Sequence, residues 1–393
     1  MTSSDAKRLS SGGLTASLSR RNLVGSAVAL AAASRLAPTI AQEGASLAPT
    51  GLTAQSVYSF DATSDVLLYS QNPDERLAIG SLVKIVTALI VMETVSDLST
   101  EVLIDESDTV DITVYSNMQL VAGDTLTVSL LLYGLLIPSG NDGARALARY
   151  AGSQISGNDD PDTARSAFVD RMNAFAQEQG LVNSQFLNAD GIDARDTFST
   201  AREIAALFSL LMDNERLREI VSLPTYRGTS SGPEARVYED DTTNQRLGQN
   251  GIIGGKTGTT EEAGACVAFA REDASGNTVI TAILGSTAEY NDSSELVTDE
   301  RWNDADTLLG AMDEQLTWIE PPDDDALPGL GDEMSVWQVE TREQAPVPMR
   351  VGDDQTMFQL VLGAPVAAGE AAGSVDLFYG EIQLGSFPVY QAG

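Results

Sequence analysis

The chain contains no histidine and only one cysteine. Without histidine, a Ser-His-Asp triad is excluded, and so is any site that binds a metal through histidine. A single cysteine excludes an internal disulfide and any zinc or iron-sulfur cluster built from several cysteines. Cys266 lies in the apolar run Ala265–Phe269. We therefore expect Cys266 to be a small buried hydrophobic residue and not a nucleophile.

Lysine is also scarce, because only Lys7, Lys84 and Lys256 occur among 23 basic residues. Arginine fills the other basic positions, and arginine does not release its proton in proteins. A lysine kept in such a chain is a candidate for proton transfer. The formal net charge of −34 also repels phosphate backbones and anionic lipid surfaces, so nucleic acid is not an expected partner.

The N-terminal residues 1–42 have the pattern of an export signal. Basic residues precede an apolar stretch from Leu23 to Ala33, which is too short to span a bilayer but has the length of a signal core. The sequence Ser-Arg-Arg-Asn-Leu-Val at 19–24 resembles a twin-arginine signal. We expect cleavage near Ala41 and export to the periplasm or the extracellular cell envelope. A disordered basic tail is the alternative.

Hydrophobic periodicity predicts early strands, a block of helices and late strands. The expected strands are 56–60, 66–69, 265–270 and 278–284, and the expected helices are 81–95, 128–137, one from 141 onward and one from 201 onward. Thr200 and Glu203 fit a capping box for the last helix. This order predicts an α+β fold, with an antiparallel sheet and helices packed on it, over residues 50–315.

A linker is expected at 321–325, where two prolines precede three aspartates. Beyond it we find no amphipathic helix, and short alternating runs such as Val375, Leu377 and Tyr379 predict a small all-β sandwich domain over 318–393.

Ser81-Leu82-Val83-Lys84 places a serine at a helix start and a lysine one turn later on the same face. Serine is a poor nucleophile until a neighbouring base takes its proton. With no histidine available, a lysine among apolar side chains is the natural base, since burial disfavours the ammonium form. Taken alone, the motif fits an ordinary helix start equally well.

Two further tripeptides carry polar chemistry. Ser139-Gly140-Asn141 follows Pro138 in a break between helices, where a hydroxyl and an amide can relay a proton and bind a peptide; a helix cap by Asn141 is the alternative. Lys256-Thr257-Gly258 precedes an apolar strand, and its lysine and hydroxyl suit a carboxylate. A glycine on an exposed edge strand would let a substrate backbone approach closely.

The three motifs occur in the order S-x-x-K, S-x-N and K-T-G, each in its expected structural context. Together with Met172-Asn173, Phe198–Arg202 and Arg301–Asp304, they make the chain resemble the low-molecular-mass D-alanyl-D-alanine carboxypeptidases, a branch of the penicillin-binding proteins. The resemblance implies the penicillin-recognising fold shared with β-lactamases and transpeptidases, a C-terminal β-sandwich, and neither a metal nor an organic cofactor.

The resemblance also implies a role for each motif residue. Ser81 would be the nucleophile and Lys84 its general base, and Ser139 and Asn141 would relay a proton and position the substrate. The substrate-binding residues would be Lys256, Thr257, Gly258, Thr259 and Arg301, with Arg202 a weaker candidate. The backbone N–H groups of Ser81 and Thr259 would form the oxyanion hole.

The expected substrates are peptidoglycan stem peptides ending in D-Ala-D-Ala, and β-lactams are expected as covalent inhibitors. Two departures from the family pattern stand out: Thr259 replaces a frequent histidine, and no C-terminal membrane-anchoring helix is evident before Gly393. A DD-endopeptidase would use the same catalytic residues, so it remains an alternative. A class A β-lactamase would need an E-x-x-L-N pattern, which we do not find between Asn141 and Lys256. A non-catalytic wall-binding protein would have lost a catalytic residue, and none is lost.

Overall fold

The computed structural model describes residue 47 and residues 49–192, 196–273, 275–291, 296–320, 327–341, 346–350, 356–379 and 382–393. The expected export signal at 1–42 and the expected linker at 321–325 lie outside the described residues. No helix within these described ranges is long and apolar enough to cross a membrane.

A five-stranded antiparallel sheet with strand order β2-β1-β9-β8-β7 lies at the centre of the fold. Its strands are β1 (Ser56–Asp61), β2 (Val66–Gln71), β7 (Ile252–Thr260), β8 (Gly264–Glu272) and β9 (Thr278–Ser286). The predicted early and late strands are confirmed, and so is the α+β class. β1 lies between β2 and β9, so an early and a late segment of the chain meet inside one sheet.

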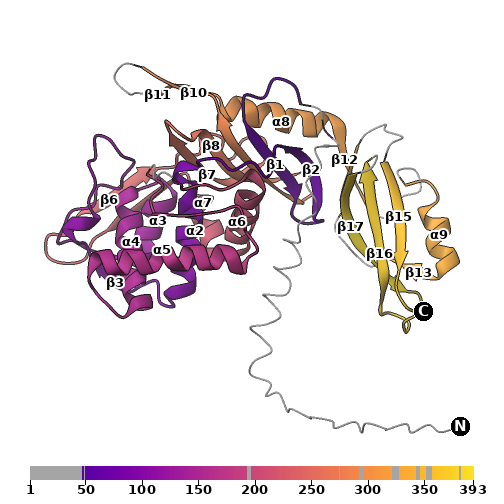
Figure 1. The fold of residues 1–393 in the computed structure, drawn as a ribbon, viewed down its shortest axis with the longest axis horizontal. Helices are drawn as coiled ribbons and strands as arrows, with labels where there is room; N and C mark the ends of the chain where they lie inside the picture. The colour runs from indigo at the N-terminus through magenta and orange to yellow at the C-terminus, as the bar shows by residue number, and fades with distance from the viewer. Residues whose placement is uncertain are drawn as a thin grey trace, which may run out of the picture. The chain divides into compact units, whose positions relative to one another are not determined.

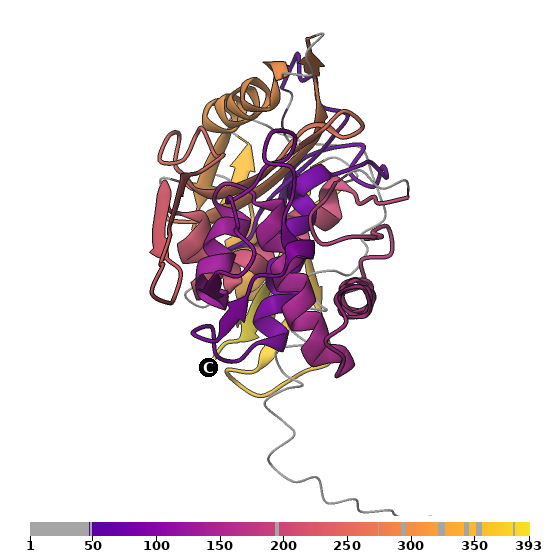
Figure 2. The ribbon, with the colours of Figure 1, turned by 90° about the vertical axis from the view of Figure 1, so that its left-hand side faces the viewer.

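Helices cover both faces of this sheet (Figures 1 and 2). On one face lies α8 (Arg301–Gln315), whose Trp302 and Met312 share an apolar cluster with Val267 and Phe269 of β8. On the other face lies α6 (Ala201–Asp213), which contacts β1, β8 and β9. Because neither face is open to water, β8 and β9 are buried over nearly their whole length.

The other helices between β2 and β7 group around α2, and of these α2 and α7 contact α6. They are α2 (Val83–Thr94), α3 (Val128–Leu136), α4 (Asn141–Ser156), α5 (Pro161–Glu178) and α7 (Glu215–Val221). Contacts with α3, α4, α5 and α6 surround α2, which explains why its sequence is apolar on nearly every side. A short 3₁₀ turn at Gly80–Leu82 leads into α2, so Ser81 lies just before its first turn.

The predicted capping box at the start of α6 is only half present. Thr200 caps the helix, because its side chain accepts a hydrogen bond from the backbone N–H of Glu203. The Glu203 carboxylate does not return to Thr200 but accepts hydrogen bonds from Asn183 N–H and the Ser184 hydroxyl. A tertiary contact therefore takes the place of the reciprocal bond, and the prediction was wrong on that point.

Short antiparallel ribbons accompany these helices and the sheet. These are β3 (Glu101–Leu103) with β4 (Thr125–Thr127), β5 (Thr225–Thr229) with β6 (Val237–Asp241), and β10 (Ala288–Tyr290) with β11 (Leu296–Asp299).

The C-terminal region is mostly β-structure. Its four-stranded sheet has the order β13-β17-β16-β15, and β12 (Leu316–Ile319) pairs with β14 (Val347–Arg350). The bounds are β13 (Val339–Glu340), β15 (Thr356–Leu362), β16 (Ala371–Tyr379) and β17 (Ile382–Gln391). The limits of a separate domain at 318–393 stay a prediction, because residues 38–393 form one compact unit.

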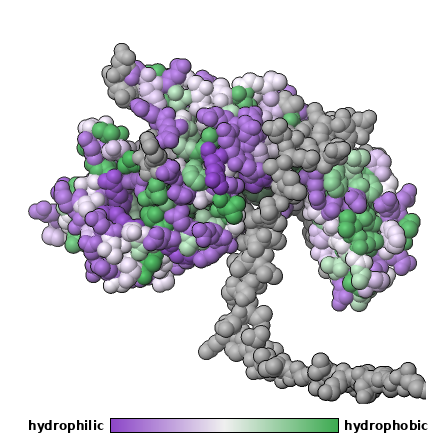
Figure 3. Space-filling view, viewed as in Figure 1, coloured by the Kyte–Doolittle hydropathy of each residue, from purple (hydrophilic) through white to green (hydrophobic). Residues whose placement is uncertain are grey.

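One helix of this region was missed from the sequence. α9 (Leu330–Trp337) is only eight residues long and buries just Leu330 and Met334, which is too little periodicity to stand out in the sequence. Apolar residues are visible over the C-terminal strands in Figure 3. Met357 and Val361 of β15 are exposed.

Candidate active site

Ser81 and Lys84 lie side by side at the start of α2. Lys84 is completely buried, because it belongs to a helix surrounded by other helices. Its Nζ lies 2.8 Å from Ser81 Oγ, within hydrogen-bond reach. The structure therefore brings together the serine and the lysine that the sequence selected.

The surroundings of Lys84 Nζ fit a neutral amine. Besides Ser81 Oγ, Nζ contacts Asn141 Oδ1 at 2.6 Å and the backbone carbonyl of Asp190. Both of these groups only accept hydrogen bonds, whereas a hydroxyl can also donate. A neutral amine has two N–H donors for the two acceptors and one lone pair, which then faces the Ser81 hydroxyl.

Electrostatics favour the same protonation state. Burial lowers the pKa of Lys84 to about 8, while the carboxylates of Asp190 and Asp142 partly oppose this shift and Arg145 adds to it. The neutral form is therefore accessible near neutral pH, as a general base requires.

Ser139 and Asn141 come from the break between α3 and α4. Ser139 adopts a left-handed conformation, with φ of 68°, directly after Pro138. The cap of α4 is Gly140, and Asn141 is the first helical residue. The helix-cap alternative for Asn141 was wrong, because its side-chain oxygen is directed to Lys84.

The K-T-G strand lies at the edge of the sheet, as β7, and faces Ser139. Lys256 is completely buried, and its Nζ donates hydrogen bonds to Ser139 Oγ (2.7 Å) and to the carbonyl of Thr257 (2.8 Å). Burial and the positive charges of Lys84 and Arg301 hold the pKa of Lys256 well below its usual range. This lysine therefore lacks an anionic counterpart within the described structure, so an incoming carboxylate would stabilise its charged form.

Gly258 allows a close backbone contact inside the protein. A Cβ atom on Gly258 would lie 2.4 Å from the carbonyl oxygen of Ile79. The glycine thus lets the turn before Ser81 pack against β7. β7 is an edge strand, and the approach of a substrate backbone to it stays a prediction.

Arg301 links β7 and β8 through hydrogen bonds to their backbone. The side chain is buried, and its Nε donates to Asp299 at 2.7 Å. Its Nη1 donates to the carbonyls of Gly258 (3.0 Å) and Cys266 (2.8 Å), and its Nη2 donates to the Thr259 hydroxyl. Of the five N–H donors of a guanidinium, one is left for a ligand.

One pocket of about 270 Å³ is lined by five of the predicted site residues, namely Ser81, Ser139, Thr257, Thr259 and Arg301. The other predicted residues, Lys84, Asn141, Lys256 and Gly258, do not line it. Its walls are rich in hydroxyl groups and comprise Ser81, Ser116, Ser139, Thr242, Thr243, Gln245, Thr257, Thr259, Asp299, Arg301 and Trp302. Ser81 and Thr259 both line it, as an oxyanion hole between their N–H groups requires. Arg202 is not part of it, because its guanidinium pairs with Asp74 at 2.7 Å.

Two residues of the surroundings were not selected as site residues from the sequence. The buried Asp142 carboxylate accepts N–H bonds from Met118 and Leu120, each at 2.9 Å, and so anchors the loop that carries Ser116. Burial raises the pKa of Asp142, although the hydrogen bonds from these backbone N–H groups act to lower it. The Thr243 hydroxyl accepts a 2.7 Å hydrogen bond from the Thr257 hydroxyl. The position of Asp142 directly after the S-x-N motif could have identified it from the sequence. Thr243 lies in no motif, so nothing in the sequence indicated it.

Cys266 is completely buried beside the site, as expected, and burial raises the pKa of its thiol to about 11. No group of three or more cysteine, aspartate or glutamate side chains in the described ranges could hold a metal ion.

Residues 43–288 match the D-alanyl-D-alanine carboxypeptidase family of peptidases. The chain belongs to this family. The D-alanyl-D-alanine carboxypeptidase of Streptomyces sp. strain K15 is 36% identical over 247 residues, which are 60% of this chain and 82% of the relative. The D-alanyl-D-alanine endopeptidase of Escherichia coli is 28% identical over 227 residues, which are 55% of this chain and 66% of the relative.

Solved structures agree with this membership in the carboxypeptidase family. The crystal structure of the Streptomyces K15 DD-transpeptidase has a TM-score of 0.60 and 31% identity, and covers 67% of this chain and 98% of its own. The family resemblance seen in the motifs and the expected penicillin-binding-protein fold are thus confirmed.

Proposed function

We propose that this carboxypeptidase removes the terminal D-alanine of peptidoglycan stem peptides through an acyl-enzyme on Ser81. The observation that supports this most directly is the 2.8 Å contact between Ser81 Oγ and the buried Lys84 Nζ, whose other two partners are acceptors only. Release of D-alanine from a pentapeptide ending in D-Ala-D-Ala tests the activity. A protein that binds this peptide without releasing D-alanine would be a wall-binding protein.

In the first half of the reaction, Ser81 Oγ bonds to the carbonyl carbon of the penultimate D-alanine while its proton passes to Lys84. The N–H groups of Ser81 and Thr259 stabilise the oxyanion. The carbon–nitrogen bond then breaks, and the Ser139 hydroxyl relays the proton held by Lys84 to the leaving nitrogen, which makes Lys84 neutral again. The Ser139 oxygen already accepts a bond from Lys256, so its own hydrogen is available for that nitrogen. Water then attacks the Ser81 ester, which releases the shortened peptide and restores the hydroxyl.

The same acylation step applies to β-lactams, which present a strained amide to Ser81. A β-lactamase hydrolyses the resulting ester quickly. The lining of this pocket is a reason to expect slow hydrolysis here. Among the described lining residues the sole carboxylate is Asp299, and its partner is Arg301. A deacylating water therefore has no free glutamate beside it.

An endopeptidase that cuts cross-links is the second candidate, supported by the likeness to the Escherichia coli endopeptidase. The two activities differ in what lies beyond the scissile bond. A pentapeptide has a free D-alanine carboxylate there, whereas a cross-link continues into another stem. Incubation with a cross-linked dimer and with a pentapeptide at equal concentration separates them, and we expect the pentapeptide to react faster.

Recognition of the terminal carboxylate by Lys256 gives a specific prediction. Amidation of the C-terminal D-alanine removes the negative charge, so we expect kcat/KM of the wild type to fall by roughly tenfold or more, the scale of a lost charged hydrogen bond. In Lys256→Gln the free acid should already be poor, and amidation should change its rate much less. Arg301→Gln, measured in the same way, reports whether the one remaining N–H of Arg301 contributes. An equal loss on amidation in all three proteins would assign the carboxylate to other groups.

We also propose export by the twin-arginine route. The proposal rests on Arg20-Arg21 ahead of the short apolar stretch, and on a family whose substrate is the cell wall. Replacing both arginines by lysine keeps the charge but removes the twin-arginine motif. We therefore expect the precursor of this variant to accumulate in the cytoplasm. Unchanged export of the lysine variant, measured by fractionation, would point to a general secretory signal.

A further inference from the structure

A second and larger cavity lies behind the catalytic lysine. Its volume is about 530 Å³, against about 270 Å³ for the catalytic pocket. It opens between α4, α5 and the segment of residues 187–192. Its lining residues are Ser107, Arg145, Ala148, Arg165, Ser166, Val169, Asp170, Leu187, Asn188, Ala189, Asp190 and Ile192. None of them lines the catalytic pocket.

The segment 187–192 is a wall shared by this cavity and the catalytic centre. The backbone carbonyl of Asp190 accepts a hydrogen bond from Lys84 Nζ, and that of Ala189 accepts one from Thr87 at 2.7 Å. Gly191, with φ of 81°, packs so closely on the backbone of Gly80 that a Cβ atom would lie 2.3 Å from the Gly80 oxygen. A ligand in the cavity would therefore lie one layer of backbone away from Ser81 and Lys84.

Two guanidinium groups of this cavity keep unused donors. Arg145 Nε pairs with Asp190 at 2.9 Å and its Nη1 donates to a carbonyl at 3.3 Å, whereas its Nη2 has no partner among the described residues. Arg165 donates through Nη2 toward Ser107 and Asp108, and its Nη1 has no partner in the described ranges; its Nε is also unpaired there but is itself buried. In a chain with net charge −34, arginines with donors to spare beside a cavity favour binding of an anion.

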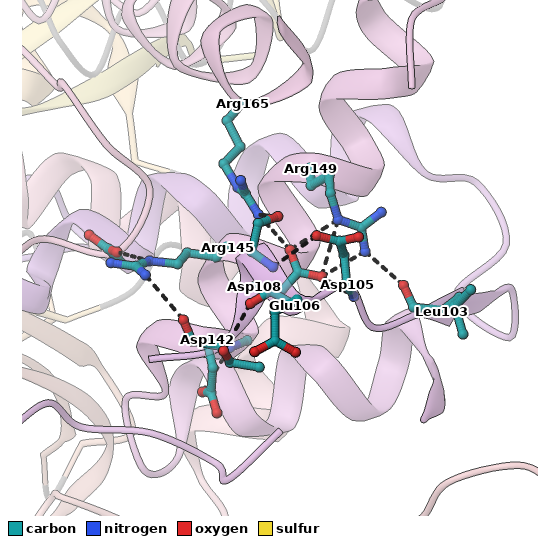
Figure 4. Close-up of polar contacts among 12 residues, drawn as sticks. Leu103, Asp105, Glu106, Asp108, Asp142, Arg145, Arg149 and Arg165 are labelled. Atoms are coloured by element: carbon teal, nitrogen blue, oxygen red, sulfur yellow. Dashed lines mark hydrogen bonds and ion pairs between the residues drawn. The ribbon is translucent and has the colours of Figure 1, made fainter. Parts of the chain in front are cut away.

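Asp108 forms ion pairs with two arginines, of which only Arg165 lines the cavity. Arg149 and Arg165 converge on its carboxylate, at 2.7 Å and 2.6 Å (Figure 4). Arg149 donates to Asp108 through two nitrogens and to the carbonyl of Leu103, and it does not line the cavity. Arg149 can therefore hold Asp108 by itself, which leaves Arg165 available for a ligand.

The rest of the lining offers a complementary charge and small apolar surfaces. Asp170 lies one helical turn after Ser166 on α5, and within the described ranges its carboxylate forms no ion pair or hydrogen bond. Val169, Leu187 and Ile192 supply apolar contacts between the charged groups. A ligand with one carboxylate, one ammonium group and a small apolar part fits this arrangement.

We propose that this cavity is a second ligand site, which binds an amino acid or short peptide that has both a free carboxylate and a free amino group. The guanidiniums of Arg145 and Arg165 hold the carboxylate, and Asp170 holds the ammonium group. The proposal concerns binding only and does not depend on the activity proposed for Ser81.

The test is equilibrium dialysis of labelled D-alanine and of the dipeptide lysyl-D-alanine against the benzylpenicillin acyl-enzyme, in which the catalytic pocket is filled. Ionic strength is held constant, because a charge of −34 makes every anion measurement sensitive to salt. We expect one saturable site. Arg165→Gln should weaken binding by roughly tenfold or more, whereas the matched Arg149→Gln should change it by less than about twofold.

Ser166→Trp gives a second variant that keeps every ion pair, because Ser166 is exposed, lines the cavity and has no side-chain hydrogen bond to the described residues. The indole should fill the cavity and abolish binding. Analogues with an amidated carboxylate or an acetylated amine should also fail to bind. The proposal is overturned if the acyl-enzyme binds neither probe, if Ser166→Trp binds as the wild type does, or if a blocked analogue binds as tightly as its parent.

Discussion

Ser81→Ala should lose the covalent benzylpenicillin adduct completely and lower the release of D-alanine by on the order of 10⁴-fold or more, the scale seen when a nucleophile is removed from a group that acts as a unit. The physical reason is that the pocket then contains no hydroxyl within reach of Lys84 Nζ, which otherwise lies 2.8 Å from Ser81 Oγ. Mass spectrometry of the intact protein and of its peptides measures the adduct, which in the wild type should map to the peptide containing Ser81.

The control for this variant is Ser153→Ala, which removes a hydroxyl from α4 that bonds only to the Tyr150 carbonyl of its own helix. It should form the adduct at the wild-type rate. A penicillin adduct that persists in Ser81→Ala on another serine, such as Ser139, would move the nucleophile to that residue.

Lys84→Arg should slow acylation by at least about a hundredfold, which is the usual contribution of a general base. Arginine keeps the positive charge but does not release its proton, so it cannot accept the proton of Ser81. Stopped-flow acylation with a chromogenic β-lactam measures the rate. Near-normal acylation of this variant would show that another group activates Ser81.

The pH dependence sharpens this prediction. The reactive form of Lys84 is the neutral amine, and its pKa is about 8. Below that pH the ammonium form dominates, so the wild-type acylation rate should rise nearly tenfold per pH unit up to about 8 and then level off. In Lys84→Arg the rise should disappear. Measurement between pH 5.5 and 9.5 at constant ionic strength separates a lost base from a structural defect, which would lower the rate without removing the pH dependence.

The sequence was sufficient to predict that Ser81 and Lys84 lie side by side, because the S-x-x-K motif is local. S-x-x-K fixes two side chains on one face of a helix, and the absence of histidine left Lys84 as the candidate base for Ser81. The predicted helices and strands rested on equally local patterns, such as the apolar surface of α2. That surface also implied a buried Lys84, which the structure shows.

Contacts between distant segments could not be predicted in this way. The role of Gly258 depends on Ile79, and the donors of Arg301 are directed to strands far from it in sequence. The Asp190 carbonyl beside Lys84 belongs to a backbone, which leaves no trace in side-chain patterns. Glu203 looked like a local cap because nothing in its own helix revealed Asn183 and Ser184.

The position of β1 in the middle of the sheet has a consequence for biogenesis. β1 pairs with β9, and the Ser59 and Thr281 hydroxyls that meet across this pair are 222 residues apart in the chain. A nascent chain that has emerged as far as α7 contains Ser81 and Lys84, but it has neither a partner for this edge of β1 nor Lys256. Closing so long a loop makes the sheet a late and slow event in folding. A chain that ends at α7 therefore lacks both the completed sheet and Lys256, which must be synthesised before the pocket around Ser81 can be assembled.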